Sequence, residues 1–421
     1  MNKVAIIGAG ISGLSVAHFL RKDNIVTVFE KESTPGGLIR CKWVNGSLFH
    51  LCGGHVFNSK RQDVFDWFWS NFNQEKDFVK TERNSVVHFN NEIDIPYPVE
   101  NHLYMFEPEI QKNIISDLLN ISTKNTFVSD NFGTFLRERF GETLYKIYFK
   151  PYNEKVWRCS LNDIPLSWLD GKLPMPTVKE ILFNNINHVK EKSFVHSSFW
   201  YEKLNGSQYI ADTLAKEIDI CYSTPVHSLS YSTENKNWRI NDCLFDIVVF
   251  CGNIKQLVHI VDGIDVGKYV KDVDALESHG TTTVFCEIDK NPYTWIYQPS
   301  QQHQSHRIIC TGNFCETNNA ASLPNDRITA TVEFTDKVTL DKILEDLKQM
   351  PCHPKYICHQ YNQYTYPIQN SKTRHLINNL KSEFMKKNLY ITGRFAEWEY
   401  YNMDVAIGAA MDLCKSLNRM R

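Results

Sequence analysis

A GxGxxG turn near the start of the chain is the first feature that indicates chemistry, and Glu30 follows its last glycine by 17 positions. In such a turn the first glycine permits a tight bend, the second lets the backbone approach a pyrophosphate, and the third allows close strand–helix contact. The following helix N-terminus stabilises the anion, and the acidic residue accepts hydrogen bonds from the adenosine ribose. The pattern predicts a dinucleotide site. The alternative is a glycine-rich turn in a fold that has lost its ligand, which would have the same sequence pattern. The turn residues expected to contact the cofactor are Gly8, Gly10, Ile11, Ser12 and Gly13.

Hydrophobic patterns indicate the elements that must position this turn. Residues 4–7 are a continuous apolar run, which suits a strand buried on both faces of a parallel sheet. Helical spacing follows over residues 14–20, and residues 25–30 form a second strand, so the first thirty residues make one β-α-β unit. Residues 245–250 and 389–393 look like further buried strands of the same sheet. The nucleotide-binding domain is therefore expected to be discontinuous.

Two other patterns describe the rest of the chain. Residues 60–80 and 106–195 carry apolar residues at helical spacing, which predicts helices. Residues 278–335 switch to alternation of apolar and polar residues, which predicts an antiparallel sheet.

Composition narrows the class of protein. The chain has 421 residues, of which 42% are hydrophobic and 22% charged, as is typical of a folded protein of two or three domains. With 46 basic and 48 acidic residues the formal charge is −2, so no global basic field attracts nucleic acid or anionic lipid. Residues 4–20 are too short and too polar to span a bilayer and lack signal-peptide cleavage chemistry, so we expect a cytoplasmic protein. The twelve cysteines include no CxxC pair, and we expect free thiols and no metal site.

The segment after the second strand bears on which dinucleotide is bound. Residues 30–37 (EKESTPGG) resemble the glutamate and glycine doublet found there in amine-oxidase-like FAD proteins. Adjacent glycines let the backbone run beside a flat or charged ligand without obstruction. The resemblance favours FAD over NAD and implies cofactor contacts for Glu30, Lys31, Gly37 and Leu38. The plain alternative is a surface turn, which Pro-Gly-Gly also forms.

Four more stretches, spread from the start of the chain to its end, resemble the UDP-galactopyranose mutase family. They are residues 52–57 (CGGHVF), 95–101 (IPYPVEN), 150–157 (KPYNEKVW) and 393–404 (GRFAEWEYYNMD). In that family the GGH histidine lies against the flavin, the PYP and PYNxKxW segments bind the substrate and its uridine, and the C-terminal segment closes over flavin and sugar diphosphate. The resemblance implies flavin contacts for His55, Arg394, Met403 and Asp404, and nucleotide contacts for Tyr97, Tyr152 and Trp157.

The same resemblance implies a diphosphate site. Arg307 is similar to a diphosphate-binding arginine of the family, and Asn313 matches a polar position that follows it. Tyr366 and Tyr400 are similar to two tyrosines that hydrogen-bond the diphosphate. A guanidinium suits this role because its fork of N–H groups matches phosphate oxygens.

Two departures from the family stand out. Lys172 takes the place of another phosphate-binding arginine, and lysine keeps the charge but loses the bidentate geometry. Glu100 takes the place of a glutamine found in some members, and a carboxylate beside a nucleotide could repel phosphate or change base preference. Taken one at a time, these side chains also have ordinary structural readings: aromatic residues in a core, a surface arginine, a satisfied histidine, or a helix cap at Asp404.

The activity that the resemblance implies is a flavin-dependent isomerisation between the pyranose and furanose forms of a nucleotide-diphosphate sugar such as UDP-galactose. It would proceed through a sugar adduct on N5 of reduced FAD, with His55, Arg307 and Lys172 at the reacting centre. An FAD-dependent oxidase or desaturase of the amine-oxidase-like group is the first alternative, although it would need no phosphate cations. A non-enzymatic binding protein, as in the Rab GDP-dissociation inhibitors, is the second.

The fold class we predict is α/β: a discontinuous Rossmann-like FAD-binding domain with a helical insertion and an antiparallel β-sheet substrate domain. We expect residues 1–80, 200–265 and 386–421 in the FAD-binding domain, 100–199 in the insertion, and 81–99 and 266–385 in the sheet domain. The expected partner is a nucleotide-diphosphate sugar, with no nucleic acid and no membrane. A homo-oligomer, the sugar, the base and the physiological reductant are left open.

Overall fold

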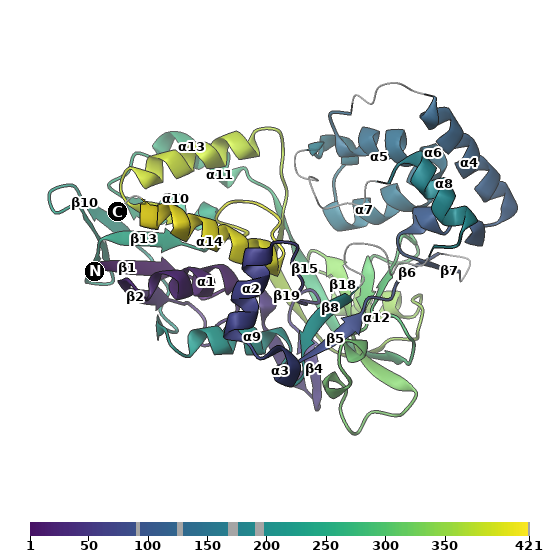
Figure 1. The fold of residues 1–421 in the computed structure, drawn as a ribbon, viewed down its shortest axis with the longest axis horizontal. Helices are drawn as coiled ribbons and strands as arrows, with labels where there is room; N and C mark the ends of the chain where they lie inside the picture. Colours follow the sequence, from purple (N-terminus) through teal and green to yellow (C-terminus); the bar gives the residue numbers. More distant parts are fainter. Residues whose placement is uncertain (90–92, 124–128, 167–175, 190–197, 420–421) are drawn as a thin grey trace.

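The structure, a computed structural model, describes residues 1–89, 93–123, 129–166, 176–189 and 198–419. It is a mixed α/β molecule with three parts: a parallel sheet between helices, an antiparallel sheet, and a cluster of helices at one end (Figure 1). The predicted fold class is confirmed.

A five-stranded parallel sheet forms the centre of the nucleotide-binding part. In spatial order its strands are β20 (Leu389–Ile391), β13 (Ile247–Phe250), β1 (Asn2–Ile7), β2 (Asn24–Phe29) and β9 (Asp219–Cys221). All of β13 and the second half of β1 are buried, which explains why these sequences are continuous apolar runs. Its strands come from distant segments, so this sheet is discontinuous in sequence, as expected.

Helices cover both faces of the parallel sheet. On one face α1 (Ile11–Leu20), α2 (Gln62–Asn71), α9 (Ser207–Ala215) and α14 (Met403–Arg419) contribute to a shared apolar core. On the other face lie α10 (Ile254–Ile260), α11 (Gly267–Asp274) and α13 (Thr373–Met385). A small sheet of β10 (Leu229–Ser232), β11 (Asn237–Ile240), β12 (Cys243–Phe245) and β14 (Val261–Asp262) extends this second side.

The placement of α11 and α13 differs from the expected domain boundaries. Both were assigned, within residues 266–385, to the antiparallel sheet domain, but their apolar residues pack with Val248 and Phe250 of the parallel sheet. The reason is that a parallel sheet must be covered on both faces, and without these helices its second face would be exposed to water.

A seven-stranded, mostly antiparallel sheet forms the second part. Its spatial order is β19 (Lys355–Pro367), β15 (Ser278–Asp289), β18 (Arg327–Thr335), β17 (Arg307–Ile309), β16 (Trp295–Tyr297), β6 (Ser85–His88) and β7 (Asp94–Pro96). Only the β16–β6 pair is parallel among these strands. The antiparallel sheet predicted from alternation is confirmed.

Alternation of polar and apolar residues usually indicates a strand with one face in solvent, but in β18 every residue is buried. Its apolar face packs on α12 (Leu340–Leu347) through Val332 and Phe334. Its polar face, which carries Glu333, lies under the ribbon of β3 (Cys41–Val44) and β4 (Ser47–His50), where Phe49 stacks on Phe285 of the neighbouring strand at 4.7 Å. The polar positions therefore line the interior and not the solvent.

The third part is helical. It comprises α4 (Pro108–Ser122), α5 (Phe132–Phe140), α6 (Glu142–Leu144), a π-helical turn (Tyr145–Phe149), α7 (Lys150–Trp157) and α8 (Val178–Ile186). Its apolar side chains share one core with Val87, Ile95 and Trp295 of the antiparallel sheet. The ribbon of β5 (Phe78–Glu82) and β8 (Ser198–Glu202), with the short α3 (Gln74–Asp77) before it, joins the parts.

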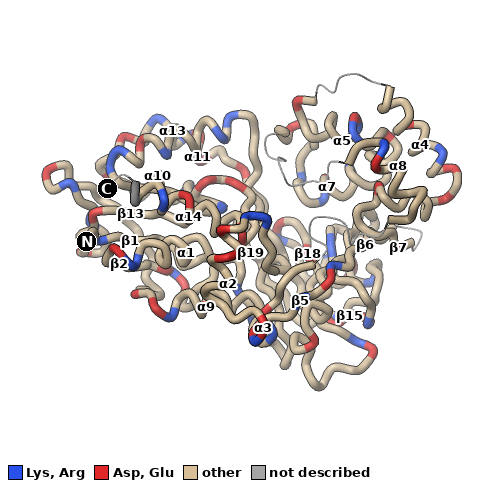
Figure 2. Tube along the Cα trace, viewed as in Figure 1, with Lys and Arg blue, Asp and Glu red and all other residues tan. Residues whose placement is uncertain are grey.

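Charges are distributed evenly. Figure 2 shows Lys and Arg interspersed with Asp and Glu over the molecule, in agreement with the formal charge of −2. All twelve cysteines are free. Among the described helices, none is long and apolar enough to cross a membrane.

Candidate active site

The glycine turn adopts the backbone geometry that its GxGxxG sequence predicts. Gly8 has a φ of +104°, and a Cβ on Gly13 would lie 1.9 Å from the carbonyl oxygen of Gly8, so neither position accepts a side chain. The Gly36 N–H donates to the Ala9 carbonyl at 2.8 Å, and a Cβ on Gly37 would lie 3.2 Å from Cα of Gly10. The two glycine segments thus run side by side and leave a bare backbone surface next to the N-terminus of α1.

Glu30 holds this turn in place. Its buried carboxylate accepts hydrogen bonds from the backbone N–H groups of Ala9 at 2.6 Å and Glu32 at 2.9 Å. Each carboxylate oxygen has a second lone pair, so Glu30 can still accept a hydrogen bond from a ribose hydroxyl. Lys31 behaves differently, because its side chain is 73% exposed and, within the part of the chain that the structure describes, forms an ion pair with Glu32 alone at 3.8 Å.

The C-terminal segment meets the same end of α1. A Cβ on Gly393 would lie 2.9 Å from Oγ of Ser12, so only glycine permits this approach. Met403 is buried in the core shared with α1, and burial raises the pKa of Asp404 in the first turn of α14. The structure therefore brings most of the predicted cofactor residues together; these are Gly8, Gly10, Ile11, Ser12, Gly13, Glu30, Gly37 and Met403. Leu38 follows Gly37 in the chain, and Asp404 lies beside Ser59 and Lys60.

Two arginines and two tyrosines, here called the arginine–tyrosine cluster, converge between the parallel and antiparallel sheets. Nη2 of Arg307 donates to the Tyr366 hydroxyl at 3.0 Å, and the Tyr366 ring stacks on Tyr400 with an interplanar angle of 5° and a centroid distance of 5.6 Å. The Arg394 guanidinium lies 4.6 Å from the centre of the Tyr400 ring. Residues nearly a hundred positions apart in the sequence thus form one contact chain.

The charge balance of this cluster is positive. Arg307 pairs with Glu333 at 2.5 Å, whereas Arg394 bonds the carbonyl oxygens of Thr365 and Tyr401. In the described ranges no carboxylate pairs with Arg394. One guanidinium is therefore compensated only by carbonyl dipoles and an aromatic face, an arrangement that suits an anionic ligand.

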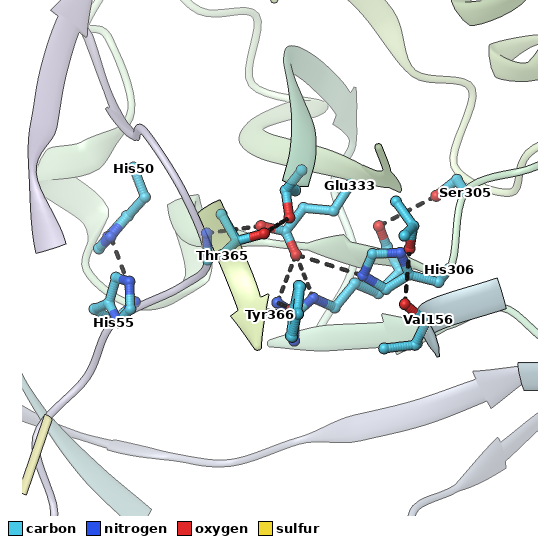
Figure 3. Close-up of polar contacts among 12 residues, drawn as sticks. His50, His55, Val156, Ser305, His306, Glu333, Thr365 and Tyr366 are labelled. Carbon is cyan, nitrogen blue, oxygen red and sulfur yellow. Dashed lines mark hydrogen bonds and ion pairs between the residues drawn. The ribbon is translucent and has the colours of Figure 1, made fainter. Parts of the chain in front are cut away.

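Glu333 belongs to this site, although the sequence analysis did not single it out. One oxygen accepts the N–H of Gly53 at 2.7 Å and the other accepts Nε of Arg307 at 2.5 Å, while His306 lies 3.6 Å away (Figure 3). Burial alone would raise the pKa of Glu333, but Arg307 and His306 outweigh it and hold that pKa well below its usual range. The single signal in the sequence is an acidic residue among threonines and apolar residues in β18.

His55, in the loop that Glu333 holds, is a neutral imidazole. Burial, followed by the nearby Arg394 and His50, lowers its pKa to about 3. Its Nε2 is buried without a partner among the described residues, and its ring lies against Gly53, where a Cβ would come within 3.2 Å of Nε2. A side chain with an unused ring nitrogen beside two arginines is available for one hydrogen bond to a ligand.

The aromatic residues predicted to hold a nucleobase are separated by the structure. Tyr152 lines a cavity of about 130 Å³ together with Tyr97, Tyr148 and Tyr297, whereas Trp157 packs edge-on against Tyr366 at 5.8 Å. Five residues along a helix correspond to about 140° of rotation, so the two rings point to different neighbours. We call the cavity lined by these four tyrosines the tyrosine pocket.

One predicted substrate residue, Asn313, is not brought to the cluster. The side-chain amide of Asn313 donates to the carbonyls of Asn291 at 2.8 Å and Tyr293 at 2.6 Å, which gives it a structural role in that loop. Lys172 lies outside the described residues.

Comparisons with known proteins agree with this geometry. Residues 6–71 match the family model of an NAD(P)-binding Rossmann-like domain. The chain is 22% identical to UDP-galactopyranose mutase of Mycoplasma genitalium, over 96% of this chain and 92% of the relative. It is 27% identical to dTDP-fucopyranose mutase of Escherichia coli over 42% of this chain and 46% of the relative.

Solved structures share the fold. A crystal structure of reduced UDP-galactopyranose mutase has a TM-score of 0.86 at 19% identity and covers 100% of this chain and 96% of its own. An engineered putrescine oxidase has a TM-score of 0.66 at 12% identity, covering 99% of each chain. The similarity to UDP-galactopyranose mutases extends along nearly the whole chain, which confirms the resemblance indicated by the sequence motifs.

Proposed function

We propose that this protein is an FAD-dependent mutase that interconverts the pyranose and furanose forms of a nucleotide-diphosphate sugar. The observation that carries the proposal is the arginine–tyrosine cluster, in which Arg307, Arg394, Tyr366 and Tyr400 meet beside the loop that carries His55. Two guanidiniums and two tyrosine rings suit the oxygens of a diphosphate. An enzyme that acts on an amine, which carries no negative charge, would not need these cations.

The cofactor residues fit FAD. The bare glycine backbones of Gly10 and Gly37 and the N-terminus of α1 suit a pyrophosphate, and the buried Glu30 suits a ribose. Bound in its reduced form, FAD would supply a nucleophilic nitrogen, N5, to the anomeric carbon of the sugar. His55, which is neutral and whose Nε2 has no partner among the described residues, would hydrogen-bond the flavin ring system.

The chain's own residues have the task of keeping the leaving group. Arg307 and the hydroxyls of Tyr366 and Tyr400 hold the released diphosphate so that it can return to the anomeric carbon after the ring has reclosed. Glu333 keeps the Arg307 guanidinium in place without neutralising Arg394. Lys172, which the family resemblance places at a second phosphate contact, would add a further cation.

A direct test uses the purified FAD-loaded protein after reduction by dithionite. We expect it to convert UDP-galactopyranose or dTDP-fucopyranose into the furanose isomer, detected by chromatography, and cyanoborohydride to trap a flavin–sugar adduct. The same protein in its oxidised form is the control and should be inactive, because oxidised N5 carries no nucleophilic lone pair. Absence of product and adduct with all sugar nucleotides tried would contradict the proposal.

The same preparation tests the oxidase alternative, which remains a candidate because putrescine oxidase has the same fold. Oxygen uptake with putrescine and other amines would favour that alternative. A purified protein that is colourless and cannot be loaded with FAD would instead favour the alternative of a non-enzymatic binding protein.

A further inference from the structure

The C-terminal end of α7 is bonded by side chains of the antiparallel sheet. The backbone leaves the helix at Arg158, which has a φ of +48°, so no further helical turn supplies N–H donors to the last carbonyl groups of α7. The Thr335 hydroxyl at the end of β18 donates to the Lys155 carbonyl oxygen at 2.7 Å. His279, on β15, bonds the Trp157 carbonyl oxygen through Nε2 at 2.7 Å. The helical part of the molecule is therefore joined to the sheet at this point.

His279 uses both nitrogens of its ring. Nδ1 lies 2.8 Å from one carboxylate oxygen of Asp336 and 3.0 Å from the other, and Nε2 lies 2.7 Å from the Trp157 carbonyl oxygen. A carbonyl oxygen and an ionised carboxylate can each accept a hydrogen bond but cannot donate one. Both ring nitrogens must therefore carry a proton, which makes the imidazole of His279 a cation. A cation is also favourable at the C-terminal end of a helix.

Within the ranges that the structure describes, Asp336 is the one charged group that bonds this ring, and the His279 side chain is 16% exposed. The elements packed against the ring carry these other titratable or charged groups: Glu154, Lys155, Arg158 and Cys159 at the end of α7, Glu277 before β15, Tyr361 and Tyr366 on β19, and Lys337 after β18. Lys155 is directed elsewhere, because its ammonium group donates to two loop carbonyl oxygens. The charge of the ring is therefore set chiefly by Asp336.

His279 also lies beside the arginine–tyrosine cluster. Its backbone is paired with Tyr366 in the β15–β19 ladder, and the Trp157 ring packs edge-on against Tyr366 at 5.8 Å. The Tyr366 hydroxyl in turn accepts a hydrogen bond from Arg307 at 3.0 Å. One residue thus holds both members of the Trp157–Tyr366 pair, the tyrosine through the backbone and the tryptophan through the charged ring.

We propose that His279 and Asp336 form a charged clamp that positions Trp157 against Tyr366 and so keeps the diphosphate contacts of the cluster in place. His279 is a positioning residue, because it acts through Trp157 and Tyr366. The inference rests on the proposed function, since it takes the ligand of the cluster to be a nucleotide-diphosphate sugar. The neutral ring has a single N–H, so it can bond Asp336 or the Trp157 carbonyl but not both. The clamp is therefore closed at low pH and is released when a rise in pH removes the second proton from the ring.

Replacing Asp336 by asparagine separates the clamp from its pH dependence. The asparagine oxygen can accept the Gly280 N–H, which bonds a carboxylate oxygen of Asp336 at 3.1 Å, while the NH₂ group donates to Nδ1 of His279. A neutral His279 then keeps its Nε2–H for the Trp157 carbonyl, so the clamp stays closed at every pH. Asp336 has a φ of +65°, a conformation that asparagine adopts readily, so the exchange adds no backbone strain.

The test measures the affinity of the oxidised FAD-loaded protein for UDP-galactose or dTDP-fucose, whichever binds, by calorimetry from pH 6 to pH 8.5. Titrations elsewhere are common to the parent and Asp336→Asn and cancel in the ratio of their dissociation constants. We expect the parent to lose affinity relative to this variant by about threefold to tenfold over the range, a coupling common between residues in contact. Asp274→Asn is the matched control, because Asp274 pairs with His259 at the same distance of 2.8 Å on α10 and α11. Its ratio to the parent should stay constant.

A second variant removes the clamp at every pH. His279→Leu should bind at pH 6 with the weaker affinity that the parent shows at pH 8.5; if this variant does not fold, the ratio between the parent and Asp336→Asn decides alone. A constant ratio, or parent-like affinity of His279→Leu at pH 6, would overturn the clamp while leaving the mutase proposal intact. If no sugar nucleotide binds to the parent at any pH, the proposed function and this inference both fail.

Discussion

Replacing Glu333 by glutamine tests whether the arginine–tyrosine cluster is held by one buried carboxylate. Glu333 accepts two hydrogen bonds, from Gly53 N–H and from Arg307 Nε, on separate oxygens. Glutamine has one acceptor oxygen, so one donor would face an NH₂ group and Arg307 would lose its counter-charge. Removing one partner of a buried ion pair costs about 3–5 kcal/mol, and because glutamine keeps one bond we expect the lower end, about 3 kcal/mol.

The assay is chemical denaturation of FAD-saturated protein with and without UDP. The free energy of unfolding should fall by about 3 kcal/mol in Glu333→Gln, and a fixed concentration of UDP should stabilise the variant more than the parent, since the diphosphate replaces the missing negative charge beside Arg307. Glu287→Gln, on the adjacent strand β15 and partly exposed, is the control and should change stability by less than about 0.5 kcal/mol. A loss below about 1 kcal/mol, or equal stabilisation of both proteins by UDP, would refute the reasoning.

Three other substitutions test separate parts of the molecule. Gly13→Ala places a Cβ 1.9 Å from the Gly8 carbonyl oxygen, so the purified variant should lose most of its flavin absorbance, whereas Gly267→Ala, with nothing nearer than 3.7 Å, should keep it. Arg307→Ala should weaken UDP-sugar binding by about tenfold to a hundredfold, measured by calorimetry, with little change in FAD content; equal loss of both would refute a diphosphate role. Burial lowers the pKa of Lys155 to about 7, so above pH 7 the unfolded chain binds a proton that the folded protein does not, and the contribution of this group to stability rises with pH. Buried thiols with raised pKa values act in the opposite direction above about pH 8, so the comparison is made from pH 6.5 to pH 8. In Lys155→Met the denaturation midpoint should increase less with pH over this range than in the parent, and identical profiles would contradict the assignment.

The parts of the fold that could be predicted are those in which local sequence decides structure. The GxGxxG turn needs glycine for steric reasons that act within a few residues, and the apolar runs of β1 and β13 follow from burial on both faces. The positions of α11 and α13 could not be predicted in this way. Their helical pattern shows that one face is apolar but does not say which sheet that face covers.

The candidate site likewise contains residues that the sequence identified and residues whose contacts only the structure shows. Family motifs led to Arg307, Tyr366 and Tyr400, and the structure brings all three together. Motif spacing did not separate Tyr152 from Trp157, because the helix rotation between them turns the two rings to different neighbours. Asn313 has the right chemistry for a ligand, but its amide is used by two loop carbonyls that no sequence pattern identifies.

Glu333 shows why the remaining part of the site required the structure. An acidic residue at an alternating position in a strand normally faces water, and in β18 it would do so if the β3–β4 ribbon did not cover that face. Its burial depends on Gly53, which is 280 positions away, and on Arg307, whose charge keeps it ionised. Burial, counter-charge and loop position are therefore properties of the assembled site and of no single segment. For this reason, substitution of Glu333 should alter stability and nucleotide binding together, which a carboxylate on a solvated strand would not do.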